Sequence, residues 1–345
     1  MKIVLTPEIE AWLNTCRDNI LYDEKADFVG ARVTKAGEKK LQRAMAEAGF
    51  AEFQGPESEW PSLFLSADEW ESSPYHSTVS LDWIKDADYY YETRKIQGRE
   101  LFNSDCIQKD PERSLNDWMK LRAMDRNFES IYLYQTAKDL EEDLDWMMDA
   151  PSEAVTNDIP ASKAHGNVLT FGLGIGYFVF MAMRNPEVKS ITVVENSPEV
   201  IAMFRRFLEP QFPGNVPLYI NEADAYEMFT EEFLSDFDYI YTDIWLSSED
   251  GLAAIDKLLS QYNPPFEKAD FWIEDSCFEI MWTLSVLYFE SLAFNEPYDV
   301  SESALYYMKK IEAYYDGIDE TVDQVDRLKF LAYDTRTIRE ILAGK

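Results

Sequence analysis

The sequence predicts an α/β fold: a doubly wound, mainly parallel sheet that follows a mostly helical N-terminal part and precedes a helical C-terminal extension. Three observations lead to this prediction. From Gly166 onwards, short β-branched runs alternate with helical stretches, which is the pattern of a parallel sheet covered by helices. The first of these runs ends in a glycine-rich turn. The segments on both sides of this region show helical periodicity.

Five strands are expected in the central region, because each run is rich in β-branched or aromatic residues. They are "NVLTF" (167–171), "SITVVE" (190–195), "VPLYI" (216–220), "FDYIYTD" (237–243) and "ADFWIED" (269–275). Helices are expected between them, at 177–184, 198–208, 224–234 and 250–261. Several of these helices open after Ser, Asp or Asn, and "NSPEV" adds a proline in the first turn, which is a helix start signal.

The N-terminal part is expected to form a mostly helical domain over residues 1–125. "PEIEAWLNTCRDNIL" places its apolar side chains on one stripe of a helix. "SLNDWMKLRAM" does the same with Leu115, Trp118 and Leu121. Residues 55–77 lie between these segments and show no clean period, which indicates a loop or short elements.

Residues 126–165 are expected to connect this domain to the sheet domain. "ESIYLYQ" (129–135) favours a strand. "SEAVTNDIP" (152–160) is interpreted either as a lid over a bound cofactor or as a plain linker. The sheet domain then covers residues 166–280, and helices fill residues 281–345, where apolar stretches leave room for a homodimer contact.

The composition restricts the classes of partner. The chain carries 65 acidic and 32 basic residues, a formal net charge of -33, and this field repels nucleic-acid phosphates. A nucleic-acid substrate is therefore disfavoured, whereas a cationic substrate would be attracted. The acidic run "KDLEEDLDWMMD" (138–149) is itself interpreted as the solvated face of a helix.

Membrane, disulfide and metal chemistry are not expected. No apolar run reaches the roughly 18 residues that a membrane helix needs, and the first residues turn polar too soon for a signal peptide, so a cytoplasmic location is predicted. The three cysteines are widely spaced and are interpreted as free thiols. His76 and His165 are the only histidines, which is too few for a His-rich metal site, and both are expected to be structural.

The glycine turn "GLGIG" after the first strand indicates a ligand site. Glycines there let the backbone approach a ligand closely and direct helix N-terminal amides at it. A dinucleotide fold expects G-x-G-x-x-G, but here the third glycine comes one position early, at Gly176, and Tyr177 follows it. This spacing suits a ligand without a pyrophosphate, such as S-adenosylmethionine, over the bare backbone of Gly172 and Gly174.

Acidic residues follow the next strands at the places where such a ligand needs them. Glu195 ends the second strand, 19 residues beyond Gly176, where a carboxylate can accept from both hydroxyls of a ribose. Asp224 follows the third strand and could accept from an adenine amino group, with Ala225 donating its backbone N–H. An N-cap role for Asp224 is the competing interpretation, and the two roles are compatible.

Asp243 ends the fourth strand. Because ligands of doubly wound sheets bind beyond the carboxyl ends of the strands, Asp243 is expected to face the same crevice as Gly174, Glu195 and Asp224. We expect it to orient or deprotonate an amine or hydroxyl. Tyr177 and Trp245 are expected to wall this pocket, although Trp245 is equally well explained as a core aromatic.

These residues resemble the Rossmann-like S-adenosylmethionine-dependent methyltransferase superfamily, and more narrowly its spermidine-synthase-like branch. The match covers about residues 146–275 and includes the glycine turn, the acidic second strand and the segment before them. The resemblance implies a class I methyltransferase-like fold and a transferase that uses S-adenosylmethionine. It further implies a catalytic role for Asp243 and the following cofactor contacts: Gly172, Gly174 and Gly176 at the methionine part, Glu195 with its neighbour Asn196 at the ribose, and Asp224 and Ala225 at the adenine.

The expected function is in-line methyl transfer to a small molecule or peptide. Three alternatives stay open, and the third of them, an NAD-dependent oxidoreductase, is disfavoured by the glycine spacing. The first is aminopropyl transfer from decarboxylated S-adenosylmethionine, but the D-x-x-D-P pattern of that branch is absent, since Leu246 and Ser247 stand where its second aspartate and proline would be. That branch also has a β-rich N-terminal domain, which is not expected here. The second alternative is a non-catalytic protein that retains the nucleotide pocket.

Overall fold

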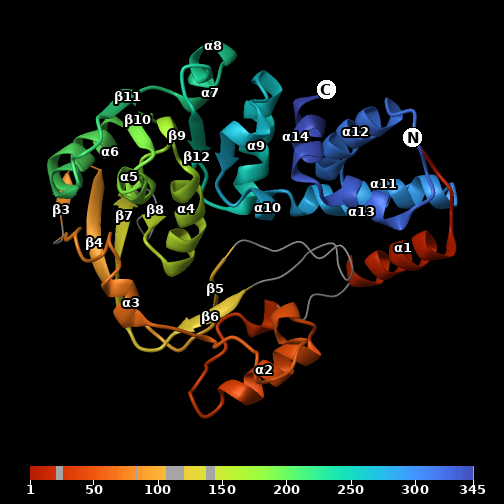
Figure 1. The fold of residues 1–345 in the computed structure, drawn as a ribbon, viewed down its shortest axis with the longest axis horizontal. Helices are drawn as coiled ribbons and strands as arrows, with labels where there is room; N and C mark the ends of the chain where they lie inside the picture. The colour runs from red at the N-terminus through yellow and green to blue at the C-terminus, as the bar shows by residue number, and fades with distance from the viewer. Residues whose placement is uncertain (21–25, 82–83, 87, 106–119, 137–143, 345) are drawn as a thin grey trace.

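The computed structural model describes residues 1–20, 26–81, 84–86, 88–105, 120–136 and 144–344. It is an α/β structure in which a sheet-bearing part, a small lobe around α2 (Glu38–Glu47) and a group of helices near the C-terminus are distinct (Figure 1). The α/β class predicted from the sequence is confirmed.

The central sheet is parallel and has the five predicted strands. They are β9 (Gly166–Phe171), β10 (Val188–Glu195), β11 (Leu218–Glu222), β12 (Tyr239–Thr242) and β13 (Ala269–Phe271), in the order β11-β10-β9-β12-β13. The chain moves outward from β9 to β11 and then returns to the other side of β9 as β12. The order therefore reverses at β9, and ligands of such sheets bind beyond the carboxyl ends of the strands at this point.

Helices connect these strands, as the sequence predicts. They are α5 (Tyr177–Met183), α6 (Pro198–Met203), α7 (Ala225–Met228), α8 (Glu231–Leu234) and α9 (Ser248–Gln261), with a π-helical turn after α6 (Phe204–Leu208), and α10 (Glu274–Cys277) follows the last strand. Local capping explains several starts, since the side chains of Ser197, Thr230 and Ser247 each accept from a backbone N–H in the first turn.

Residues 152–160, which the sequence analysis interprets as a lid or a linker, are helical. They belong to α4 (Pro151–Lys163), which packs against α5. Pro151 occupies the first turn, where a missing N–H is tolerated. Ala154, Pro160 and Ala161 are buried and fix the helix to the domain.

The expectation of a mostly helical N-terminal domain is wrong. Beside α2 and α3 (Ala67–Glu71), the described residues contain two sheets. One is antiparallel, in the order β3 (Ile84–Asp86), β4 (Tyr89–Ile96), β7 (Phe128–Gln135) and β8 (Leu144–Met148), and the other joins β2 (Phe64–Leu65), β6 (Leu121–Met124) and β5 (Phe102–Asn103). The strand expected at 129–135 is confirmed as β7.

Two helix predictions fail at these strands. Leu121, which was assigned to a helical stripe, begins β6, while Leu115 and Trp118 lie outside the described residues. Part of the run 138–149 also lies outside them, and its last part forms β8 instead of a helix face. Backbone pairing with β7 decides the structure of β8, and pairing with β2 and β5 decides that of β6.

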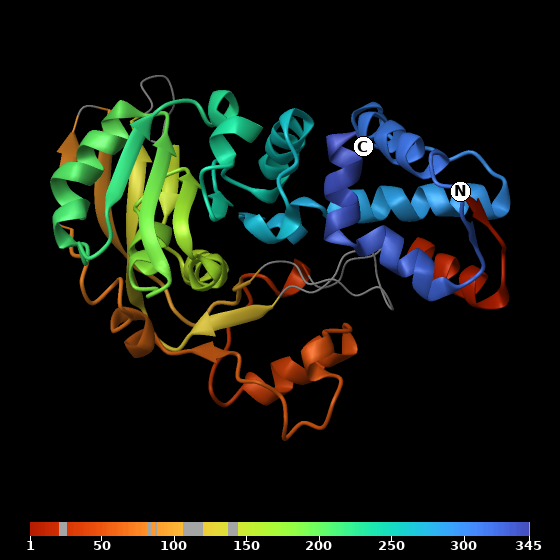
Figure 2. The ribbon, with the colours of Figure 1, turned by 45° about the horizontal axis from the view of Figure 1, so that its top comes forward.

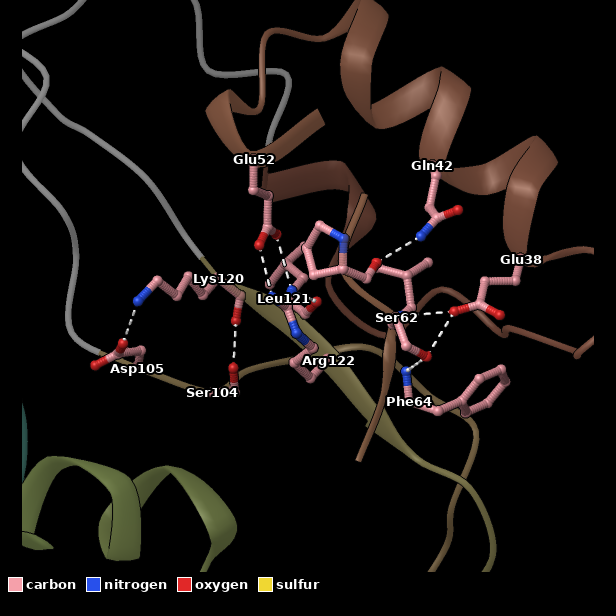
Figure 3. A network of polar contacts seen from close by, with 12 residues as sticks. Glu38, Gln42, Glu52, Ser62, Phe64, Ser104, Asp105, Lys120, Leu121 and Arg122 are labelled. Atoms are coloured by element: carbon pink, nitrogen blue, oxygen red, sulfur yellow. Dashed lines mark hydrogen bonds and ion pairs between the residues drawn. The ribbon is translucent and has the colours of Figure 1, made fainter. Parts of the chain in front are cut away.

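The small lobe has its own apolar cluster, with Met45, Phe50, Leu63 and Leu121 fully buried. Figure 3 shows the polar contacts around it. Arg122 on β6 donates to both carboxylate oxygens of Glu52, at 2.8 and 2.6 Å. Glu38 accepts from the Ser62 hydroxyl at 2.8 Å, which ties α2 to the segment before β2.

The two ends of the chain form one helical unit. α11 (Glu279–Phe294) packs against α12 (Glu302–Asp316) and α13 (Val325–Tyr333), while α14 (Thr335–Ala343) packs against α9. From the other end, α1 (Pro7–Ile20) contacts α11 and α13, and β1 (Lys2–Ile3) pairs with β14 (Thr321–Val322). Figure 2 shows α1 in red beside the blue C-terminal helices. The first 20 residues therefore lie with the C-terminal helices.

Candidate functional site

A cavity of about 430 Å³ lies at the carboxyl ends of the central strands. Its wall contains every site residue predicted from the sequence except Gly176. The lining includes residues that follow β9, β10, β11 and β12: Gly172, Gly174, Tyr177, Glu195, Asn196, Asp224, Ala225, Asp243 and Trp245. The parallel sheet thus brings together side chains that are far apart in sequence.

The glycine turn requires glycine at each of its three positions, for different reasons. Gly172, Gly174 and Gly176 have φ values of +95°, +49° and +73°, in the region that side chains disfavour. A Cβ on Gly172 would collide with the carbonyl oxygen of Asp243, and one on Gly174 would collide with the Met147 sulfur. Met147 comes from β8, and its sulfur accepts from the Ile175 N–H at 3.3 Å.

Gly176 serves packing and does not line the cavity. It is the N-cap of α5, and a Cβ there would meet the rings of Phe204 and Phe212. Its expected contact with a cofactor is therefore not supported by its position. Because the third glycine comes one position earlier than in a dinucleotide fold, α5 begins directly after it, and Gly176 packs against the aromatic core.

Glu195 is buried at the end of β10 and holds the turn in place. Its carboxylate accepts from the Leu173 N–H at 3.1 Å and from the Ser197 N–H at 2.8 Å. Burial raises the pKa of this carboxyl, and the backbone amides oppose that shift only in part. Each oxygen keeps further lone-pair capacity for hydroxyl donors. The neighbouring Asn196 is exposed at the rim.

Asp224 is the N-cap of α7, as the competing interpretation held. Its carboxylate accepts from the Tyr226 N–H at 2.8 Å. The side chain is exposed and also lines the cavity, as does the buried Ala225. The capping role and a ligand contact are therefore compatible.

Asp243 is half-buried at the end of β12, with desolvation raising the pKa of its carboxyl to about 7. Glu153 on α4 lines the same cavity. Burial raises the pKa of Glu153 to about 8, and the charges of Asp243 and Asp149 contribute. Two carboxyl groups in one cavity therefore titrate near neutral pH, which is common at functional sites.

Glu153 and Asn157 are site residues that the sequence analysis missed. They lie one turn apart on α4 and both line the cavity. The signal for them in the sequence was the i, i+4 spacing of Glu153 and Asn157 near the start of a helix, which places both side chains on one face. It was overlooked because the segment was interpreted as a lid or linker.

Aromatic side chains form much of the remaining wall. The predicted wall residues Tyr177 and Trp245 are joined there by Trp146, Phe178, Tyr226, Tyr241 and Trp272. Tyr177 donates its hydroxyl to Asp158 at 3.0 Å, and Trp245 stacks on Phe271. Trp245 is thus a core aromatic as well as a wall residue. Among the described residues that line the cavity there is no Lys, Arg or His.

The histidines lie apart from this wall. His76 Nε2 is 2.5 Å from Oδ2 of the buried Asp149, and His165 Nδ1 is 2.9 Å from the Lys163 carbonyl oxygen. Within the described ranges, no group of three or more His, Cys, Asp or Glu side chains is arranged to hold a metal ion. The same part of the chain contains no helix with the length and apolar character needed to cross a membrane.

Comparison with known proteins gives little further information. No family model and no curated protein matches the chain. Among solved structures, a Δ1-pyrroline-2-carboxylate reductase from Thermococcus litoralis, solved with NADH and L-proline, shows 10% identity and a TM-score of 0.20, covering 33% of this chain and 36% of the reductase. A shikimate dehydrogenase from Mycobacterium tuberculosis shows 13% identity and a TM-score of 0.23, covering 44% of this chain and 61% of the dehydrogenase.

PKMT2 from Rickettsia typhi, solved in complex with AdoHcy, shows 19% identity and a TM-score of 0.21, covering 55% of this chain and 39% of PKMT2. The match spans less than two thirds of each of these three proteins. Likeness at this level does not distinguish a nicotinamide nucleotide from S-adenosylmethionine as the ligand.

Proposed function

We propose that this protein is an S-adenosylmethionine-dependent methyltransferase that acts on an amine of a small molecule or peptide. The observation that carries the proposal is the charge of the cavity: its described wall has four carboxyl groups, from Glu153, Glu195, Asp224 and Asp243, and no cationic side chain. S-adenosylmethionine and an ammonium are both cations and suit this wall, whereas its carboxylates would repel the pyrophosphate of NAD.

The residues fit this cofactor at each part. The bare backbone of Gly172 and Gly174 would lie against its methionine end, Glu195 and Asn196 against the ribose, and Asp224 with Ala225 against the adenine. When bound, the cofactor supplies a methyl group on a sulfonium that is already a good leaving group. The protein then has mainly to align the acceptor, and alignment alone contributes several kcal/mol, up to roughly 7–11 in well-oriented systems.

Asp243 would orient the attacking amine, and the aromatic walls would exclude water and attract its positive charge. Because the surrounding side chains are acidic and aromatic, an amine is favoured over a hydroxyl as the methyl acceptor. In this proposal the cavity sits where the strand order reverses, as in other doubly wound sheets.

Aminopropyl transfer is the second candidate, and one observation favours it. The antiparallel sheet β3-β4-β7-β8 lies ahead of the cofactor domain in the chain, where the spermidine-synthase-like branch has its β-rich domain. Leu246 and Ser247, in place of the second aspartate and proline, lower this candidate.

The experiment is isothermal titration calorimetry with S-adenosylmethionine, S-adenosylhomocysteine, decarboxylated S-adenosylmethionine and NAD. We expect the first two to bind and Glu195→Ala to weaken both by about 10- to 100-fold, because a hydrogen bond to a charged group contributes about 1.5–3 kcal/mol. Glu222→Gln is the control, since Glu222 pairs with Glu195 across β10 and β11 but is exposed and does not line the cavity.

Preference for the decarboxylated ligand would replace methyl transfer with aminopropyl transfer, and binding of NAD alone would overturn the proposal. A non-catalytic binder is tested separately. Asp243→Asn should keep S-adenosylhomocysteine affinity and lose transfer of a labelled methyl group to a panel of amines. If the wild-type protein binds the cofactor and methylates no member of a broad acceptor screen, the non-catalytic alternative is favoured.

A further inference from the structure

The four carboxylates of the cavity fall into two groups according to their partners. Glu195 is held by the backbone N–H groups of Leu173 and Ser197, and Asp224 by that of Tyr226. For the carboxylates of Asp243 and Glu153, by contrast, the described residues supply no hydrogen bond and no ion pair. The first group lies at the proposed cofactor end, and the second group is open to a further ligand.

Glu153 is presented by a rigid element. The Tyr241 hydroxyl donates to Asn157 Oδ1 at 3.0 Å, and Asn157 Nδ2 donates to the Glu153 carbonyl oxygen at 3.0 Å. On the adjoining turn, Trp272 Nε1 donates to the Thr156 hydroxyl at 2.9 Å. These bonds fix α4 to the ends of β12 and β13, so the position of Glu153 in the cavity wall is determined by the fold.

An unpartnered, half-buried carboxylate is unfavourable for stability, because its ionised form loses solvation without compensation. Two such groups in one cavity also repel each other, as the effect of Asp243 on Glu153 shows. No cationic side chain among the described lining residues relieves this repulsion. The arrangement is explained if a cationic ligand supplies the missing partner.

We propose that Glu153 is a second catalytic acid–base residue, which accepts the proton that an acceptor ammonium must lose, while Asp243 orients the amine. The inference rests on the proposed function. The ammonium N–H bond breaks and its proton passes to the Glu153 carboxylate, which leaves the nitrogen with a lone pair. The nitrogen then bonds to the methyl carbon as the carbon–sulfur bond breaks, and the electron pair of that bond stays on sulfur. The products are a methylated ammonium, a thioether and protonated Glu153, which returns its proton to solvent.

The acidity of Glu153 suits this role. Burial and the charges of Asp243 and Asp149 raise its pKa to about 8, closer to that of an amine than an ordinary glutamate is. Among the other titratable side chains of the described wall, Glu195 and Asp224 are held by backbone N–H groups, and the hydroxyls of Tyr177 and Tyr241 are bonded to Asp158 and Asn157. Asp149 is paired with His76. Glu153 and Asp243 are therefore the groups left to exchange a proton with the ligand.

The test uses sinefungin, an analogue of S-adenosylmethionine in which an amine-bearing carbon replaces the methylsulfonium. Its ammonium lies where the methyl group would be and needs no acceptor to be known. Calorimetry at pH 7 in buffers of different ionisation enthalpy measures affinity and proton release, each relative to S-adenosylhomocysteine. Before binding, the ligand amine is an ammonium and Glu153 is protonated. Only one of these two protons can be kept between the two groups, so we expect binding to release on the order of one proton.

Glu153→Gln should remove most of this release, with Asp243 supplying the remainder, and lower sinefungin affinity about tenfold or more, while S-adenosylhomocysteine affinity stays within about twofold. Glu153→Asp should show part of the wild-type proton release. Asp243→Asn should lower the affinity for sinefungin but keep most of the proton release. Glu227→Gln is the charge-matched control, since Glu227 is exposed on α7 outside the cavity. Sinefungin binding that Glu153→Gln leaves unchanged would overturn the role of Glu153. Failure of both ligands to bind the wild-type protein would instead overturn the proposed function.

Discussion

Gly172 is the residue at which the backbone of the site is most constrained. Its φ of +95° alone disfavours any side chain, and the carbonyl oxygen of Asp243 occupies the space of a Cβ. Gly172→Ala should therefore lower the free energy of unfolding by about 2–5 kcal/mol, the sum of a left-handed backbone and a steric clash. Urea denaturation measures this change.

Gly30 provides the matched control for this substitution. Its φ of +78° is similarly left-handed, but a Cβ there would have no atom within 4 Å. Gly30→Ala should therefore lose only about 1–2 kcal/mol. Equal losses at the two glycines would show that the contact with Asp243 carries no energy.

Glu153 makes a prediction about pH as well. Its pKa is raised in the folded protein to about 8, so between the ordinary glutamate pKa and 8 the folded state binds more protons than the unfolded state. The stability associated with this group is present at low pH and is lost as the pH rises through 8. Glu153→Gln should thus be more stable than wild type at pH 9, by on the order of 1–3 kcal/mol, with a smaller difference at pH 5.

The measurement is the urea midpoint of both proteins at pH 5, 7 and 9. The difference between them isolates Glu153 from the other acidic groups. If the wild-type protein instead becomes more stable relative to Glu153→Gln as the pH rises, Glu153 has a cationic partner in the folded protein.

At the scale of elements, the central sheet made most of the site predictable. Parallel strands place their carboxyl ends at one edge, so Gly172, Glu195, Asp224 and Asp243 could be assigned to one cavity from chain order alone. Gly176 does not line the cavity, and the sequence does not reveal this, because glycine spacing does not distinguish close approach to a ligand from close approach to Phe204 and Phe212.

The contributions of α4 and β8 could not be predicted in this way. Glu153 and Asn157 reach the cavity only because α4 packs on α5, and Met147 only because β8 pairs with β7. These are tertiary contacts without a local periodic signal. For β4 the signal was present, since "YYYETRKI" is rich in Tyr, Thr and Ile, residues that favour strands.

A buried ion pair contributes to the attachment of α14, beside the apolar side chains that this helix buries. Arg339 is 2% exposed and donates to both carboxylate oxygens of Glu274 on α10, one of them at 2.7 Å, and to the Ala269 carbonyl oxygen at 3.0 Å. Arg339→Met leaves Glu274 without its partner and should cost about 3–5 kcal/mol of unfolding free energy.

The same helix supplies the control. Arg336 pairs with Glu267, but these side chains are 54% and 74% exposed, so Arg336→Met should change stability by no more than about 1 kcal/mol. Adding Glu274→Gln to Arg339→Met should cost less than the two single changes together. Strict additivity in this double-mutant cycle would contradict the coupling.

At the scale of the whole molecule, the excess of negative charge opposes compactness. The net charge of -33 is distributed over a chain whose ends meet in one helical unit, so repulsion acts between as well as within its parts. Local ion pairs such as Arg122–Glu52 offset only a fraction of it, because acidic residues outnumber basic ones 65 to 32. The molecule should therefore respond to ionic strength as a single polyanion.

We expect the melting temperature at pH 7 to rise by several degrees between 0.01 and 0.1 M NaCl, because the screening length falls from about 30 to about 10 Å and repulsion between distant carboxylates weakens. Screening also weakens the exposed ion pairs, but these contribute little individually. Scanning calorimetry at pH 7 and near the isoelectric point of about 4.3 separates the two effects. Near pH 4.3 the net charge is close to zero, so the gain from salt should vanish. A melting temperature that falls with salt at pH 7 would mean that specific ion pairs, and not net repulsion, dominate the electrostatics of this fold.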